Sequence, residues 1–143
     1  MSSEHSEKMP PEQRLAAEFS ALEARVSALE SAVRAGVAKA GLPGLVDEAI
    51  EIVSALMCAY AVHAGKPMPV TDDPLDVFKA FVKGDPSLNA IRDNVRELVY
   101  YRNCLKADRA DALPVNPAMM TAHTARHIYL YLRTRCTQEQ RLP

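Results

Sequence analysis

The sequence predicts an all-α protein, in which a compact helical bundle of about four helices follows a long amphipathic, coiled-coil-like N-terminal helix. Three observations predict this class. Apolar residues recur three and four positions apart in two long segments. Asp-Pro or Asn-Pro pairs, which are typical of helix starts, occur at three places. No segment alternates apolar and polar residues as a strand would. We expect a flexible tail (1–10), the long helix (11–40) and one bundle domain (45–143).

The long helix is predicted from its apolar residues, whose spacings are 4, 3, 4, 3 and 4. This heptad alternation forms a stripe that is narrower than an ordinary core-facing surface. Arg25 and Glu30 flank the stripe, where charges can pair across a two-helix seam. We expect the stripe to mediate self-association or partner docking, with packing on the chain's own bundle as the alternative. The stripe consists of Leu15, Phe19, Leu22, Val26, Leu29 and Val33.

Glycine and proline divide the remaining chain into four helices. A Gly-Leu-Pro-Gly break ends the long helix, with Gly41 suited to a left-handed C-terminal cap. The next helix, over residues 45–64, is apolar on all sides between Ala55 and Val62. Such a helix is buried on several sides, so we expect it at the centre of the bundle. The other helices are expected over residues 74–83, 85–107 and 117–138, each with its Asp or Asn as N-cap.

Length and composition are those of an ordinary globular domain: 143 residues, of which 48% are hydrophobic and 24% charged. The longest apolar run, residues 52–62, is shorter than the roughly 20 residues of a membrane span. The N-terminus lacks the apolar stretch of a secretory signal. The three cysteines form no CxxC pair, which argues against a disulfide scaffold or zinc ribbon. We therefore expect a cytoplasmic protein with no membrane contact and no cofactor.

Charge is distributed unevenly along a chain whose net charge is −1. Residues 1–85 hold 8 Lys and Arg against 13 Asp and Glu, whereas residues 86–143 hold 9 against 5. Opposed halves favour head-to-tail stacking in an assembly. Arginines interleaved with tyrosines are typical of single-strand nucleic-acid surfaces and of protein hot spots. The residues expected to contact nucleic acid or a partner are Arg92, Arg96, Arg102, Lys106, Arg109, Arg126, Arg133, Arg135, Tyr101 and Tyr131.

No motif in the sequence names a reaction. There is no GxSxG, glycine-rich phosphate loop or dinucleotide fingerprint. His123 and His127 are four residues apart, so both imidazoles can reach one ion from one helix face. A metal-binding helical-bundle protein or enzyme that uses this pair is therefore the alternative function. A third ligand would come from elsewhere, for instance His63, Cys58 or Cys104.

The pair Arg102-Asn103 resembles part of the motif of HEPN domains, which are small helical ribonucleases with a histidine a few positions further on. No histidine follows at that distance here, so an active HEPN nuclease is not expected. We expect a non-catalytic small subunit of a larger assembly, which docks to itself or to larger partner proteins. RNA or single-stranded DNA is a further candidate partner. In size, helicity and charge layout the chain resembles the small helical subunits of CRISPR-type ribonucleoprotein complexes.

Overall fold

The computed structural model describes residues 9–36 and 41–143. Within these ranges the chain forms α-helices and two short 3-10 helices, and it contains no strand. The all-α prediction is therefore confirmed. None of the described helices is long and apolar enough to cross a membrane. The elements are α2 (Pro11–Arg34), α3 (Leu42–His63), α4 (Pro74–Val82), η2 (Pro86–Ile91), α5 (Arg92–Lys106), η3 (Ala110–Ala112) and α6 (Pro117–Gln138).

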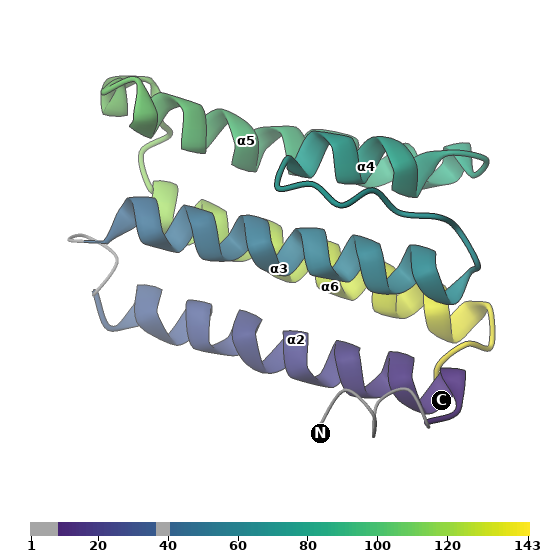
Figure 1. Cartoon of the computed structure of the whole chain (residues 1–143). Helices are drawn as coiled ribbons and strands as arrows, with labels where there is room; N and C mark the ends of the chain where they lie inside the picture. The colour runs from purple at the N-terminus through teal and green to yellow at the C-terminus, as the bar shows by residue number, and fades with distance from the viewer. Residues whose placement is uncertain (1–8, 37–40) are drawn as a thin grey trace.

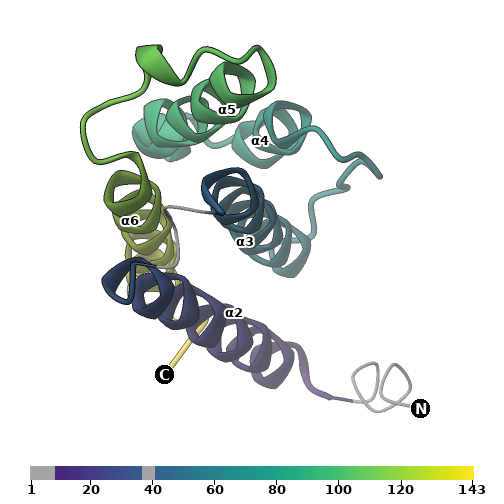
Figure 2. The ribbon, with the colours of Figure 1, turned by 90° about the vertical axis from the view of Figure 1, so that its left-hand side faces the viewer.

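The helix α3 lies at the centre of the fold, as its all-round apolar stretch predicts. It packs against α2, α4, α5 and α6. The side chains of Ile52, Leu56 and Met57 on α3 are completely enclosed. The helices are stacked in three layers, with α2 on one side, α3 and α6 in the middle, and α4 and α5 on the other side (Figures 1 and 2). The first and last helices of the described chain therefore contact each other.

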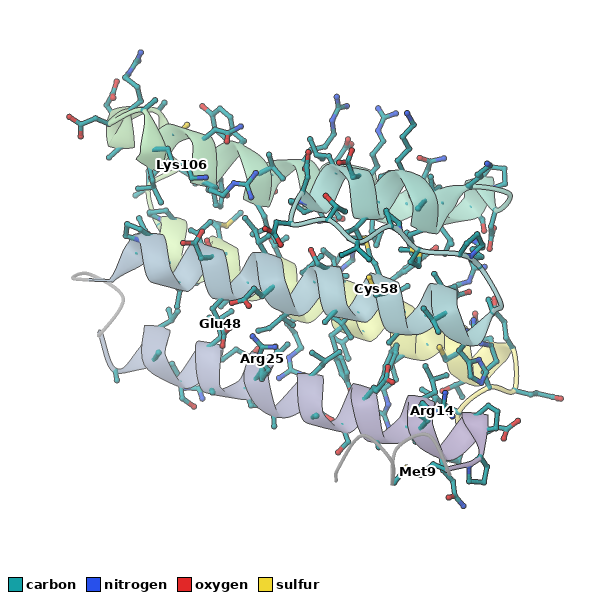
Figure 3. The ribbon with its side chains drawn as sticks, in the orientation of Figure 1. Met9, Arg14, Arg25, Glu48, Cys58 and Lys106 are labelled. Atoms are coloured by element: carbon teal, nitrogen blue, oxygen red, sulfur yellow. The ribbon has the colours of Figure 1, made fainter. Side chains whose placement is uncertain are left out.

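The heptad stripe of α2 is buried inside the molecule, so the alternative expectation, packing on the chain's own bundle, accounts for these side chains. Leu15, Phe19, Leu22, Val26 and Leu29 are at most 7% exposed, and Val33 is partly buried. The stripe packs on two helices, because α2 lies across both α3 and α6 (Figure 2). The flanking charges also pair within the chain: Arg25 points toward Glu48 of α3 and forms an ion pair with it (Figure 3).

The helix ends agree only in part with those predicted from the sequence. Asp73 caps α4 as predicted, since its Oδ1 accepts a hydrogen bond from the Leu75 backbone nitrogen at 2.9 Å. Gly41 is not a left-handed cap, because its φ is −128° and it precedes α3. Gly36, with a φ of +77°, takes the left-handed position after α2 instead. Glycine adopts this conformation at no steric cost, so α2 ends at Arg34; residues 37–40 lie outside the described ranges.

The other two proline-preceded starts lack the predicted side-chain cap. The side chains of Asp85 and Asn116 accept no hydrogen bond from the backbone of their helices, although the backbone carbonyl of each residue does. After Asp85 the chain forms the 3-10 helix η2 before α5 begins. A 3-10 helix has three residues per turn, so residues three apart share one side. Leu88 and Ile91 are therefore both fully buried on the same side of η2.

Candidate functional site

Arg126 on α6 is bound to the acidic side of α2. Its Nε and Nη2 donate to the two carboxylate oxygens of Glu30 at 3.1 and 2.6 Å, and its Nη1 lies 3.7 Å from Glu23. Tyr129 donates its hydroxyl to Glu23 at 3.0 Å, and the guanidinium lies 5.5 Å from the Tyr129 ring centroid. The Arg126 guanidinium holds the pKa of Glu30 below its usual value. Arg126, a predicted contact residue, is therefore engaged in holding α6 against α2.

Arg135 is engaged in a similar way further along α6. Its Nη2 donates to Asp85 at 3.0 Å and to Glu139 at 3.1 Å, and its Nη1 donates to the Ser87 hydroxyl at 2.7 Å. Tyr131 donates its hydroxyl to the carbonyl of Ser87 at 3.2 Å. These two predicted contact residues thus anchor α6 to the segment that begins η2.

The acidic and basic halves of the sequence meet inside the fold. The ion pairs Arg126–Glu30 and Arg135–Asp85 each join a cation from residues 86–143 to a carboxylate from residues 1–85. Charge that is separated along the sequence is therefore not separated in space.

A polar cluster that the sequence analysis missed holds the chain end against α3. We call Tyr60, His63, Glu139 and Arg141 the C-terminal clasp. The Tyr60 hydroxyl donates to both Glu139 oxygens at 2.9 and 3.0 Å, and Arg141 donates to Glu139 at 2.9 Å and to His63 Nδ1 at 3.0 Å. Burial, together with the bond to Glu139, raises the pKa of Tyr60 to about 12. These groups satisfy one another, which indicates a structural role; no local pattern in the sequence could have revealed partners 79 residues apart.

The described residues bring no metal cluster together. No group of three or more His, Cys, Asp or Glu side chains among them is placed to hold an ion. His123 and His127 are both exposed on α6 and share a face, as predicted. None of the expected third ligands, His63, Cys58 and Cys104, joins them.

Two of the three thiols are poorly suited to nucleophilic chemistry. Burial raises the pKa of Cys58, and it raises the pKa of Cys136 to about 11. Both thiols are therefore protonated near neutral pH, whereas the thiolate is the reactive form. They fill space between helices, as small apolar groups do.

Tyr101 was predicted to contact a ligand, but it is buried, with 3% of its surface exposed. Its hydroxyl is hydrogen-bonded to Glu97 of the preceding turn. Its neighbour Tyr100 is 49% exposed instead and donates its hydroxyl to the Ala112 carbonyl at 3.0 Å. One residue along a helix turns the side chain by about 100°, so only one of the two rings can face solvent.

A row of two arginines and one tyrosine follows the exposed side of α5. Arg92, Arg96 and Tyr100 are all exposed and lie four residues apart, so they share one face. We call these three residues the α5 row. Arg92 lies 3.9 Å from the exposed Asp93, and Arg96 has no ion pair within the described residues. Nitrogen-tipped side chains project outward from the layer of α4 and α5, and Lys106 lies at its far end (Figure 3).

The remaining predicted cations differ in their surroundings. Arg109 is exposed but held by Asp111, to which it donates at 3.0 and 3.1 Å. Arg133 and Lys106 are exposed and form no ion pair in the part of the chain that the structure describes. Of the predicted contact residues, these two and the arginines of the α5 row keep guanidinium or ammonium groups open to a ligand.

Arg102 is half-buried, and its Nε has no hydrogen-bond partner among the described residues. It lines a hollow of about 110 Å³ together with Asp47 of α3 and Lys106. Asp47 forms no ion pair with Arg102. An unsatisfied buried donor costs about 1–3 kcal/mol.

The outer side of α6 carries exposed residues without fixed charge over several turns. We call Met119, Met120, His123, His127, Leu130 and Thr134 the α6 outer face. Met120 and Leu130 are 37% and 48% exposed. This side of α6 points away from α3 and faces no other helix (Figure 2). At the start of α6 it continues into a groove of about 410 Å³, whose lining includes Val33, Leu42, Val115 and Met119.

Comparisons with protein-family models, with curated proteins and with solved structures gave no match. The function is therefore inferred from the surfaces themselves. Two of them combine exposure with a defined chemistry: the uncharged α6 outer face and the cationic α5 row.

Proposed function

We propose that this protein is a non-catalytic helical subunit of a larger assembly, and that it docks through the α6 outer face. The observation that carries the proposal is the exposed, uncharged face itself, on a chain in which 24% of the residues are charged. Exposed apolar patches on soluble proteins mark interaction sites. The unbranched thioethers of Met119 and Met120 adapt readily to a partner's surface.

The use of the charged groups supports a subunit rather than an enzyme. Arg126 and Arg135 bind carboxylates of other elements, and the C-terminal clasp satisfies its own donors and acceptors. Groups that hold helices together in this way are not free to exchange protons with a substrate. The face left over for recognition carries no fixed charge, which favours a protein partner.

A second ligand class is favoured by one specific observation, the α5 row. Proteins bind single-stranded nucleic acid with cationic side chains that contact its phosphate backbone and with aromatic rings that stack on its bases. The α5 row offers both kinds of group, two arginines and one exposed tyrosine ring. Nucleic-acid contact of this kind is also a property of the small helical subunits of CRISPR-type complexes, to which the chain is similar in size and helicity. We propose RNA or single-stranded DNA backbone as the ligand of this row.

The docking proposal is tested with a photo-crosslinking residue in place of Leu130, in the chain expressed in its native cells. Irradiation is expected to give a crosslinked species of discrete mass from position 130. The same residue in place of Ala24, which is exposed on α2, is expected to give none. Met120→Glu in the Leu130-substituted chain should abolish the product, because a carboxylate would be buried in the contact. Equal products from both positions, or no product from position 130, would contradict the proposal.

The nucleic-acid proposal is tested by fluorescence anisotropy with a single-stranded RNA oligonucleotide at several salt concentrations. The double variant Arg92→Ala/Arg96→Ala should bind more weakly. Its slope of log affinity against log salt should flatten by about 0.7 for each lost phosphate contact. Arg109→Ala is the matched control, because Arg109 is exposed but bound to Asp111. Equal weakening in the control, or an unchanged salt slope in the double variant, would retire this ligand class.

A further inference from the structure

Four residues of the α6 outer face are placed symmetrically about Ala125. Counting outward from Ala125 in either direction, a histidine occurs at the second residue and a large apolar residue at the fifth. The histidines are His123 and His127, and the apolar residues are Met120 and Leu130. Ala125 itself is fully buried on the opposite side of the helix, so the exposed face is centred at its level.

This symmetry makes the face complementary to a second copy of itself. In an antiparallel pair with a twofold axis at the level of Ala125, each residue faces the one equally far from the centre in the other copy. Met120 of one copy would lie opposite Leu130 of the other, and His123 opposite His127. Apolar side chains would then meet apolar ones, no fixed charge would be buried, and four imidazoles would gather at the axis.

Within the described residues, one chain supplies half of a metal site on this face. Side chains four residues apart on a helix have Cβ atoms roughly 5–6 Å apart, so His123 and His127 can bind one ion together. A tetrahedral zinc site needs four ligands. The carboxylate of Glu30, which acts electrostatically on His123, is already bound by Arg126. Within the described residues no third ligand joins the pair, so the site is incomplete without a second copy.

We propose that a divalent transition-metal ion of the zinc class binds His123 and His127 from two copies of the chain and joins them through their α6 outer faces. The inference rests on the docking role proposed for this face, and it names both the partner and the ligand. Imidazole nitrogens suit zinc, nickel and copper, whereas magnesium prefers oxygen ligands. One helix face is small beside the roughly 800 Å² per partner of a standard interface, so the apolar contacts need the ion.

The test is sedimentation velocity of the purified full chain after removal of metal with a chelator. Addition of zinc chloride is expected to convert monomer to dimer, with the conversion complete at one zinc ion per two chains. Renewed chelation should restore the monomer, and magnesium chloride should have no effect. A chain that stays monomeric at excess zinc overturns the proposal.

Two variants separate the ion from the apolar contacts. His123→Gln/His127→Gln keeps the face polar and uncharged but should lose both zinc uptake and the dimer. His63→Gln is the matched histidine control and should dimerise normally, with its fold checked by circular dichroism. A zinc-dependent dimer that survives the double replacement would refute the assignment of the ligands.

The outcomes also distinguish this inference from the proposed docking function. If zinc produces no dimer while the crosslink from position 130 still forms and is lost with Met120→Glu, the metal site is wrong and the docking function stands. If no crosslink forms and Met120→Glu leaves a zinc-induced dimer intact, the docking face has been misassigned, and with it this inference.

Discussion

Arg126 of α6 and Glu30 of α2 form a two-pronged ion pair across 96 residues of sequence. The pair is largely enclosed, since the two side chains are only 22% and 24% exposed. The Ser27 hydroxyl adds a contact to the same guanidinium at 3.2 Å. A shift of α6 by one residue would turn Arg126 by about 100° and break the pair. The contact therefore fixes which side of α6 faces α2 and which side remains outward.

Replacement of Arg126 by alanine is expected to lower the free energy of unfolding by about 2 kcal/mol, because Glu30 would be left half-buried without its partner. Urea denaturation measures the change. Arg109→Ala is the control, since the exposed Arg109–Asp111 pair is expected to contribute less than about 1 kcal/mol. Similar losses in the two variants would show that the enclosed pair is no more important than a surface pair.

The carboxylates Glu30 and Asp85 predict a loss of stability in acid. The Arg126 guanidinium lowers the pKa of Glu30, and the Ser87 hydroxyl, followed by Arg135, lowers the pKa of Asp85. In the unfolded chain these groups titrate near their ordinary values of 4.5 and 3.8. Their contribution is therefore complete above about pH 4.5 and is lost as the pH falls below it. Urea midpoints measured between pH 5 and pH 3 should fall less steeply for Glu30→Gln than for the unmodified chain.

A separate loss of stability, at milder pH, is expected from His63. Burial, followed by the charge of Arg141, lowers the pKa of His63 from its ordinary value of 6.5. As the pH falls below 6.5 the unfolded chain takes up this proton before the folded chain does, so stability decreases. His63→Gln should flatten the urea midpoint between pH 7 and pH 5.5. An unchanged slope would mean that His63 is equally accessible to protons in both states.

Replacing Leu15 tests whether the α2 stripe belongs to the core of one chain or to an interface between chains. Leu15→Ala is expected to cost about 2–5 kcal/mol of unfolding free energy, because Leu15 is enclosed between helices of its own chain. The oligomeric state measured by sedimentation should not change. Ser20→Ala, at an exposed position of the same helix, should alter stability by less than about 0.5 kcal/mol. Dissociation of an oligomer by Leu15→Ala would restore the seam hypothesis.

Arg102 predicts a stabilising substitution. Methionine retains most of the apolar stem of arginine and removes the Nε that has no acceptor. Arg102→Met is therefore expected to raise the free energy of unfolding by about 1 kcal/mol. Lys106→Met, at an exposed position that lines the same hollow, should have little effect. A destabilised Arg102→Met would indicate that the guanidinium has a partner in solution.

The sequence was sufficient for the fold class because helical periodicity is a local property. The central place of α3 followed from its apolar residues on all sides. The spacing of apolar residues in α5 also places Tyr101 on the buried side of that helix. Leu98 lies three residues before Tyr101 and is itself buried, which puts Tyr101 on the inner side. Tyr101 was predicted as a contact residue because arginines and tyrosines are frequent in this segment, and its position on the inner side of the helix was overlooked.

Tertiary partners could not be predicted in the same way. The stripe of α2 has the same spacing whether it packs against another molecule or against α3 and α6. One of its two partners, α6, begins more than 80 residues after α2 ends. Likewise, the sequence shows that Arg126 and Glu30 carry opposite charges, but only the fold brings them together.

The contact between α2 and α6 has a consequence for the order of synthesis. In the order of synthesis α2 and α3 precede α6, so the part of the α2 stripe that packs on α6 stays uncovered until α6 has been made. During this interval the uncovered part can pair with the same surface on a neighbouring nascent chain. A chain truncated before α6 would keep this part of the stripe exposed, and would be expected to aggregate or to be held by chaperones.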